Sequence, residues 1–331
     1  MTTSEPISGR GHDVLVAEDL HKSYGPRPAL RGLSFSLRAG RILGFLGPYG
    51  AGKTSAIRIL STIIEPFSGR FLVDGLGSDT PQQIRRRIGV LPESLGFPGN
   101  MTGTEFVTYF GRLYGLGGSE ARKKALEMIE AVGLKQRARS LIKSYSRGMR
   151  QRLGIARALI NDPAVVFLDE PTLGLDPKGQ QELQGLVRWI ARERNAGVVL
   201  CSHQLTEVEA VCDDVVILST GQVVAQGEVA DVIGSKEQNV VRVQVPAPAV
   251  ADAERALRGA PGVTSVIATD EAAGRLRIEF DGETDFSLDG QHVNNGILNA
   301  LIQSKVPILG MQAGGGRLQD VFLEITQGAI E

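Results

Sequence analysis

The chain has 331 residues, enough to bury a large core and to form two domains. Its formal net charge of −1 excludes a general attraction to nucleic acid or to an anionic membrane surface. Its two cysteines, Cys201 and Cys212, are too few for a disulfide scaffold and fit a reducing compartment.

The N-terminus is polar and has no apolar stretch of the kind that a secretory signal needs. We therefore expect residues 1–12 to be a disordered N-terminus. No apolar run along the chain approaches the ~18 residues that a membrane span requires. We expect a cytoplasmic chain that reaches a membrane only through a partner.

Short apolar runs alternate with helical patterns from about residue 13 to 235, which predicts an α/β fold with a parallel sheet. The early runs VLVAEDL and LSFSL predict a small antiparallel sheet at its flank. The nearly continuous apolar run 41–46 predicts a strand buried on both faces. A helix is expected from Thr54 to Ile64, ended by Pro66 because the residue before a proline avoids helical geometry.

Residues 94–145 are helical in period and predict a helical insertion in this core. The runs 164–168 and 198–201 then predict two more buried strands. Past residue 235 the order strand, helix, strand, strand, helix, strand predicts a small ferredoxin-like α+β domain over 236–331, closed by a helix in RLQDVFLEIT.

Charge differs between the two predicted domains. Residues 236–331 carry 8 Lys and Arg against 13 Asp and Glu, whereas the rest of the chain carries 28 against 24. An acidic C-terminal domain is a poor polyanion binder, because phosphate contacts need clustered Lys and Arg. We expect no nucleic-acid partner.

A glycine-rich stretch between a predicted strand and a predicted helix fits G-x-x-x-x-G-K-[ST], a phosphate-binding loop. Its glycines let backbone N–H groups converge on phosphate oxygens, and the helix N-terminus adds positive potential. We expect Lys53 to reach the β- and γ-phosphates and the Thr54 hydroxyl to bind Mg²⁺. The expected nucleotide-binding residues are Gly47, Pro48, Tyr49, Gly50, Ala51, Gly52, Lys53, Thr54 and Ser55.

A second predicted strand ends in Asp169 and Glu170, at the sheet edge where ligands bind in such folds. Asp169 is placed to hold Mg²⁺ through water, and Glu170 to orient and deprotonate the attacking water. An acidic pair on a strand end is also common for solubility alone. The phosphate loop upstream makes the catalytic interpretation the better one.

The order of these segments with SYSRGMRQRL, VVFLDEP, GLDP and SHQL resembles the ATP-binding-cassette (ABC) ATPases over roughly residues 13–230. It is most similar to the separately encoded ATPase subunits of bacterial exporters. The resemblance implies an ABC nucleotide-binding domain over 13–235, with a helical subdomain at about 94–145, and an accessory domain over 236–331. It implies ATP and Mg²⁺ as cofactors.

The resemblance also implies roles for residues outside the two motifs. Tyr24, in KSYG, matches the aromatic that stacks on adenine, and His203, in SHQL, matches the histidine that contacts the γ-phosphate. Asp176, in GLDP, matches the loop that runs along the dimer interface. The plainer alternatives are a loop tyrosine, a polar cap and a turn before Pro177.

Two positions depart from the common family pattern. Glu93, in IGVLPE, replaces the glutamine that senses the γ-phosphate. A carboxylate there can still bind Mg²⁺ or hold water, although a solvated surface glutamate is the alternative. Tyr49 replaces a common asparagine in the phosphate loop, where the backbone is the main donor, so we expect nucleotide binding to survive.

The segment SYSRGMRQRL (144–153) aligns with the family signature L-S-G-G-Q. In the family the serine hydroxyl and the second glycine N–H contact phosphate, and both are kept here as Ser146 and Gly148; Arg147 and Met149 replace the other two letters. In the family architecture this loop completes the site of a second cassette. The resemblance therefore implies a homodimer, or a pair with a paralogous cassette.

The resemblance implies an ATPase that powers a membrane exporter through ATP-driven cassette dimerisation, with a separately encoded integral-membrane permease as its partner at the inner face of the cell membrane. One alternative is a soluble ABC ATPase of translation or nucleic-acid repair, but the two cassettes or long coiled coil typical of that class are missing. A nucleotide-gated binding module with little turnover is a third hypothesis, and the intact Lys53, Asp169, Glu170 and His203 argue against it.

Overall fold

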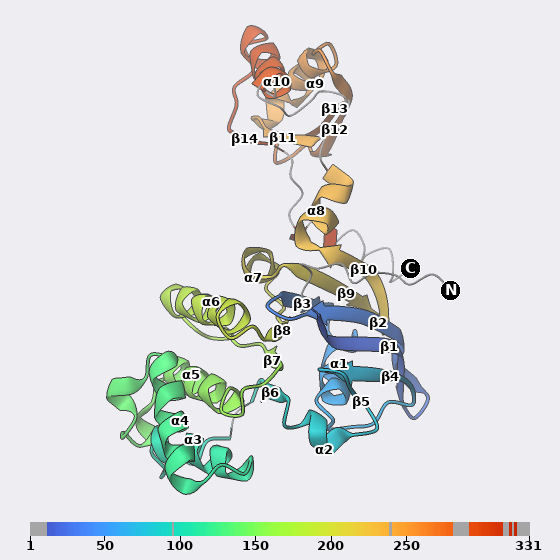
Figure 1. Ribbon diagram of the computed structural model, residues 1–331. Helices are drawn as coiled ribbons and strands as arrows, with labels where there is room; N and C mark the ends of the chain where they lie inside the picture. Colours follow the sequence, from blue (N-terminus) through green and yellow to red (C-terminus); the bar gives the residue numbers. More distant parts are fainter. Residues whose placement is uncertain are drawn as a thin grey trace. The chain divides into compact units, whose positions relative to one another are not determined.

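The computed structural model describes residues 12–94, 96–237, 240–280, 291–313, 318–319 and 321–322 (Figure 1). The chain divides into two compact units, residues 1–229 with 322–331, and residues 230–321. All but one residue of the predicted disordered N-terminus lie outside the described residues. No helix in the described part of the chain combines the length and apolar character that a membrane span needs.

A six-stranded sheet forms the centre of the first unit, in the order β10-β9-β3-β8-β7-β6. All its pairings are parallel except that of β9 with β10. Every residue of β3 and β8 is buried, which confirms the strands expected from the apolar runs. The strands are β3 (Ile42–Leu46), β6 (Ile88–Leu91), β7 (Val165–Asp169), β8 (Gly197–Cys201), β9 (Asp214–Ser219) and β10 (Gln222–Glu228).

The predicted flanking sheet is present, with antiparallel strands in the order β2-β1-β4-β5. It packs one face against the central sheet through a core that includes Phe35 and Phe45, whose ring centroids lie 5.5 Å apart. The strands are β1 (Asp13–Tyr24), β2 (Arg27–Arg38), β4 (Ser68–Val73) and β5 (Leu76–Gly77).

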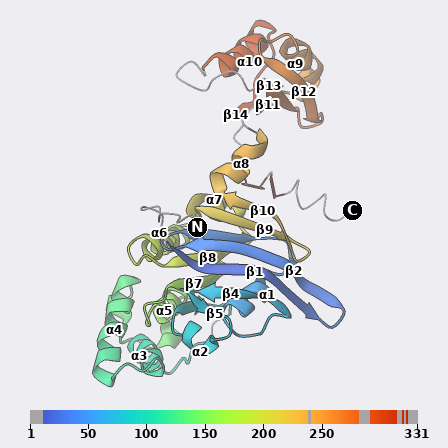
Figure 2. The ribbon, with the colours of Figure 1, turned by 45° about the vertical axis from the view of Figure 1, so that its right-hand side comes forward.

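The predicted helical insertion consists of α3 and α4, which pack against α5 (Figure 2). A second core lies between these helices and the other face of the central sheet. The helices of the first unit are α1 (Lys53–Leu60), α2 (Pro81–Ile84), α3 (Gly103–Leu113), α4 (Gly118–Ala131), α5 (Arg147–Ala158), α6 (Pro177–Arg192) and α7 (Leu205–Val211), with 3₁₀ turns at Lys135–Arg137 and Ile142–Ser144.

The predicted end of the first helix was wrong, because α1 stops at Leu60 and not at Ile64. Thr62 adopts a left-handed φ of 60°, and the N–H of Ile63 donates to the Arg58 carbonyl. This is a Schellman ending, which needs one left-handed residue and usually employs glycine for it. A threonine does not indicate a left-handed residue in advance, so the sequence did not predict this helix end, which lies well before Pro66.

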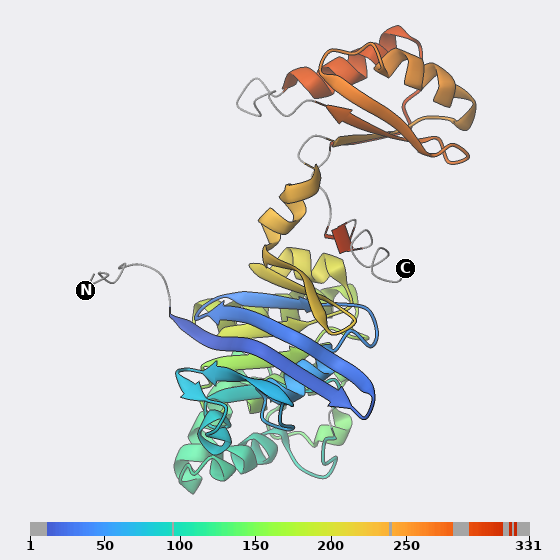
Figure 3. The ribbon, with the colours of Figure 1, turned by 90° about the vertical axis from the view of Figure 1, so that its right-hand side faces the viewer.

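The second unit has the predicted ferredoxin-like order, with an antiparallel sheet β12-β13-β11-β14. The helices α9 and α10 lie on one face of this sheet (Figure 3). Its elements are β11 (Val240–Gln244), α9 (Val250–Leu257), β12 (Val263–Asp270), β13 (Arg275–Phe280), α10 (Gln291–Gln303) and β14 (Gly310–Ala313), preceded by α8 (Val229–Glu237). Most of the predicted closing helix lies outside the described residues.

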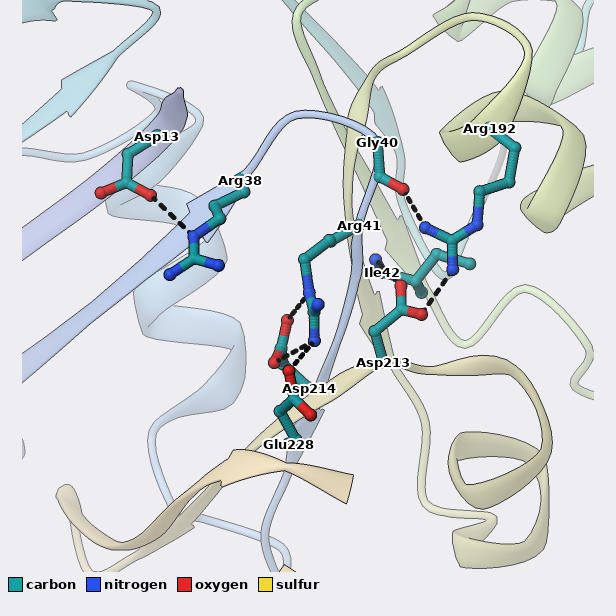
Figure 4. Close-up of polar contacts among 9 residues, drawn as sticks. All are labelled: Asp13, Arg38, Gly40, Arg41, Ile42, Arg192, Asp213, Asp214 and Glu228. Carbon is teal, nitrogen blue, oxygen red and sulfur yellow. Dashed lines mark hydrogen bonds and ion pairs between the residues drawn. The ribbon is translucent and has the colours of Figure 1, made fainter. Parts of the chain in front are cut away.

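Ion pairs join the amino ends of β3 and β9 to the carboxyl end of the antiparallel strand β10 (Figure 4). Arg41, just before β3, makes a two-pronged contact with Asp214, with Nε–Oδ2 at 2.6 Å and Nη2–Oδ1 at 2.8 Å. Its Nη2 also lies 3.0 Å from Glu228 on β10. Asp213 accepts from the backbone of Ile42 at 2.8 Å and pairs with Arg192. Asp214 and Glu228 together raise the pKa of the Arg41 guanidinium.

We expect Asp214→Asn to lower the free energy of unfolding by about 2 kcal/mol, because a charged hydrogen-bond partner is lost at a position only a quarter exposed. The matched control is Arg38→Gln, whose pair with Asp13 is long at 3.9 Å and largely exposed, and should change stability by about 0.5 kcal/mol or less. Urea denaturation of both variants checks this, and equal losses would contradict it.

Candidate nucleotide site

A cavity of about 480 Å³ collects most of the predicted site residues at the carboxyl ends of the central strands. The residues of the phosphate loop, between β3 and α1, form one wall, and residues after β7 and β8 form another. The lining comprises Tyr24, Ala29, Leu46 to Ser55, Glu93, Asp169, Glu170, Leu173, Ser202, His203, Leu205 and Phe322. Chain positions more than a hundred residues apart thus converge on one hollow.

The phosphate loop has the backbone geometry that its glycines were expected to allow. Gly52 has φ of 105°, and a Cβ on it would lie 2.3 Å from the Ala29 carbonyl oxygen, so only glycine fits. The Lys53 ammonium donates to the carbonyls of Gly47, at 2.5 Å, and Pro48, at 3.1 Å. Lys53 therefore folds back over the loop, where the phosphates of a nucleotide are expected.

Two aromatic side chains of the cavity remain accessible. Tyr24, at the end of β1, is 50% exposed, and its hydroxyl lies 3.5 Å from Ser55 Oγ. The Lys22 ammonium lies over its ring, 5.9 Å from the centroid. Tyr49 is 98% exposed, so its side chain takes no part in packing the loop and only its backbone contributes there.

Glu170 and His203 lie together at the cavity wall. His203 Nδ1 is 2.8 Å from Glu170 Oε2, and the Glu170 N–H donates to the Cys201 carbonyl. Glu170 has φ of 48°, a left-handed conformation that is costly for a non-glycine residue and clusters at functional sites. Its side chain is only 15% exposed. The fold therefore fixes this carboxylate in one orientation beside an imidazole.

Asp169 ends β7 beside Glu170. Burial, the Glu93 carboxylate and the Glu170 carboxylate together raise the pKa of Asp169 to about 6. The negative charges of Glu93 and Glu170 near Asp169 favour a bound cation. With the Thr54 hydroxyl the three carboxylates form a set of hard oxygen donors, which suits Mg²⁺. Among the described residues no three His, Cys, Asp or Glu side chains form a metal-binding group by themselves.

The predicted signature residues line a different hollow. Ser146, Gly148 and Asp176 face a separate depression of about 930 Å³ and do not reach the cavity that holds Lys53 and Glu170. Ser146 caps α5, because its Oγ accepts from the Met149 N–H at 3.2 Å, which leaves the hydroxyl hydrogen available to donate. Within one chain, the residues predicted to contact phosphate therefore lie in two separate hollows.

The loop from Glu170 to Asp176 also touches the signature segment. Arg147 lies directly over Gly174, so a Cβ on Gly174 would come within 2.5 Å of the guanidinium. Gly174 itself has a left-handed φ of 72°. Arg147, which replaces a glycine of the family signature, therefore packs against Gly174. This glycine lies in the chain between Glu170, the candidate base, and Asp176.

The sequence reasoning missed Glu207, a buried carboxylate behind the cavity wall. It is 4% exposed, and its Oε2 accepts from Thr172 Oγ1 at 2.8 Å and from Ser202 Oγ at 2.7 Å. Thr172 follows Glu170 by two residues, and Ser202 precedes His203. Glu207 thus joins the two loops that carry the candidate catalytic side chains. One signal for its burial was available in the sequence. Glu207 lies four residues before Val211 and so shares a helix face with this apolar residue.

We expect Glu207→Ala to lower kcat for ATP hydrolysis about tenfold or more while leaving KM for ATP nearly unchanged, because both loops lose a hydrogen-bond acceptor outside the cavity. Glu207→Gln keeps an oxygen acceptor and should retain more activity. Steady-state kinetics measure both, with exposed Thr206→Ala on the same helix as the control. A change confined to KM would contradict the positioning role.

Glu207 also predicts a pH dependence of stability. Burial raises its pKa above the ordinary value of 4.5. A carboxyl with a raised folded pKa stabilises the fold fully below the unfolded pKa, and this stabilisation is lost as pH rises through the folded pKa. The Gln variant cannot lose a proton, so its unfolding free energy should fall less steeply above pH 4.5 than that of the parent.

Comparison with known proteins identifies the family. The family profile described as ABC transporter matches residues 30–173. A daunorubicin/doxorubicin resistance ATP-binding protein of Streptomyces peucetius is 34% identical over 95% of this chain and 92% of its own length. The chain belongs to the ATP-binding proteins of ABC transporters.

Other relatives of this ABC ATPase agree with that assignment. A linearmycin resistance ATP-binding protein of Bacillus subtilis is 36% identical over 66% of this chain and 70% of its own. A solved ATP-binding subunit of an ABC transporter matches with a TM-score of 0.60 and 29% identity, over 66% of this chain and 91% of that one. A dimeric cassette in a post-hydrolysis state bound to ADP and Pi matches with a TM-score of 0.59 and 25% identity, over 65% of this chain and 98% of that one.

Proposed function

We propose that the chain is the ATP-hydrolysing subunit of a membrane exporter and works as a pair of cassettes. The observation that carries this is the separation of the predicted phosphate contacts. Lys53 and Glu170 line one hollow, and Ser146 and Gly148 line another. A second, oppositely facing copy brings the second hollow of one cassette to the first hollow of its partner and completes two sites.

Each group of the cavity then has a defined task. The phosphate loop and Lys53 bind the β- and γ-phosphates, and Tyr24 stacks on the adenine. Glu170 orients the attacking water and takes its proton, and His203 fixes the Glu170 carboxylate and contacts the γ-phosphate.

Mg²⁺ would be held by Thr54 and Asp169, with Glu93 able to contribute through water. The ion would neutralise charge on the phosphates. Because Glu93 and Glu170 raise the pKa of Asp169, these carboxylates repel one another without a cation. That repulsion supports the assignment of Glu93 to the same site.

Coupling to export is supported by the relatives. Proteins similar to this chain are named for resistance to daunorubicin and doxorubicin and for export of Nod factor. We propose a separately encoded integral-membrane permease as the partner, which would place the chain at the inner face of the cell membrane. On α3, Tyr109 and Leu113 remain 53% and 62% exposed and offer apolar surface to such a partner.

We retain the division into a nucleotide-binding domain over 13–235 and an accessory domain over 236–331. We also propose a helical subdomain at about 94–145. The pair of cassettes would consist of two copies of this chain or of one copy with a paralogue.

The test is to trap the Glu170→Gln variant with ATP, extract membranes in mild detergent and identify what copurifies. An integral-membrane protein held in an ATP-dependent way, with two cassettes per complex, is the expected result. Recovery with ribosomes or nucleic acid in a salt-dependent way would instead favour the soluble translation or repair alternative.

A further inference from the structure

Arg147 is a charged residue of the signature segment to which the proposed function gives no task. It stands between Ser146 and Gly148 in the chain and lines the same hollow of about 930 Å³. The residue is exposed, and within the described part of the chain no hydrogen bond or ion pair engages its side chain. A guanidinium carries five N–H donors, so those of Arg147 are open to a group from outside the chain.

The Arg147 guanidinium lies against the backbone of Gly174. A Cβ on Gly174 would lie 2.5 Å from Nη1 and 2.6 Å from Cζ of Arg147, so the charged group rests directly over the glycine. Any side chain at Gly174 would displace the guanidinium, and the left-handed φ of 72° disfavours one as well. This contact places the positive charge at the wall of the hollow, beside Ser146 and Gly148.

The carboxylates of this hollow already have partners, whereas part of its positive charge has none. The contacts in the described lining are Glu130 with Lys135, Glu182 with Arg152, and Asp176 with the Gly179 N–H. Arg137 and Lys178 also line the hollow and, like Arg147, form no ion pair with any described residue. The hollow therefore presents positive charge that its own carboxylates do not offset.

The nucleotide cavity has the opposite balance of charge. Its described lining carries three carboxylates and one lysine, namely Glu93, Asp169, Glu170 and Lys53. The phosphates of ATP would add negative charge there, which one Mg²⁺ offsets only in part. The proposed pairing of cassettes brings the positive hollow of one copy to the negative cavity of the other, so the two charges complement each other across the interface.

We propose that Arg147 of one cassette donates hydrogen bonds to the phosphates of the nucleotide held by the facing cassette. The inference rests on the proposed pairing of cassettes and adds a charged contact to it. Arg147 is flanked by Ser146 and Gly148, the two predicted phosphate contacts, which Arg137 and Lys178 are not. Guanidinium groups bind phosphate through paired N–H donors, a geometry that the ammonium of lysine does not have.

The test measures ATP-dependent dimerisation of the full-length Glu170→Gln protein, in which hydrolysis is slowed. Sedimentation velocity with ATP and Mg²⁺ gives the dimer dissociation constant. We expect Arg147→Gln to raise this constant about tenfold or more, and Arg147→Lys to raise it less because the charge remains. ATP affinity of the dilute monomer should stay within about twofold, since Arg147 lies outside the cavity of its own chain and its charge is screened by solvent.

The matched control is Arg137→Gln, which removes the same charge from the same hollow and should change the dimer dissociation constant less than about threefold. An equal loss in this control would overturn the contact, because only a diffuse positive field would then matter. An Arg147→Gln dimer as stable as that of the parent would overturn it too. If the parent forms no ATP-dependent dimer, the proposed pairing of cassettes fails, and this inference fails with it.

Discussion

Glu170→Gln is expected to lower kcat for ATP hydrolysis by about a hundredfold to ten-thousandfold and to leave ATP affinity almost unchanged. The amide keeps the size of the side chain and its contact with His203 but cannot accept a proton from water. Glu170 has a strained φ of 48° and is 15% exposed, so the substitution changes the chemistry of a side chain that the fold holds in place.

Turnover of purified protein and equilibrium binding of ATP measure the two quantities separately. The control is Glu193→Gln, an exposed glutamate just after α6. Turnover within tenfold of the parent would remove Glu170 from the role of base. A lower ATP affinity with unchanged kcat would place it in binding instead.

Lys53→Ala is expected to weaken ATP binding roughly a hundredfold, which corresponds to about 2.8 kcal/mol, and to abolish measurable turnover at ordinary ATP concentrations. The ammonium donates to two loop carbonyls, so it is already positioned inside the loop before a nucleotide arrives. Its removal takes away both the charge that meets the phosphates and a tie across the loop.

The matched control is Arg58→Gln, an exposed basic residue five residues farther along α1. It should change ATP affinity less than threefold, because its charge is screened by solvent. Fluorescence titration with a nucleotide analogue gives both affinities. Equal effects of the two substitutions would mean that the helix contributes only a diffuse field and that Lys53 has no specific contact.

The two predictions separate binding from chemistry. If both residues act as proposed, Lys53→Ala weakens ATP binding and Glu170→Gln lowers kcat. This division follows from geometry, since Lys53 lies over the loop carbonyls while Glu170 lies beside His203 elsewhere in the cavity lining.

Local sequence patterns were sufficient for the parts whose signal lies in a few consecutive residues. The apolar runs predicted the buried strands β3 and β8, and strand order along the chain predicted the ferredoxin-like topology of the second unit. The end of α1 was predicted wrongly because a left-handed Thr62 terminates it, and threonine does not mark that conformation in advance.

The amino-acid sequence by itself determined the α/β class, the phosphate loop and the acidic pair, because each depends on residue types at short, set spacings. The tertiary structure alone decided which residues meet. It showed that Glu207 joins the loops of Glu170 and His203, and that the signature residues occupy their own hollow. Only the packing of distant segments set Arg147 against Gly174. Contacts between distant segments depend on how the sheets pair and pack, and no local spacing encodes that.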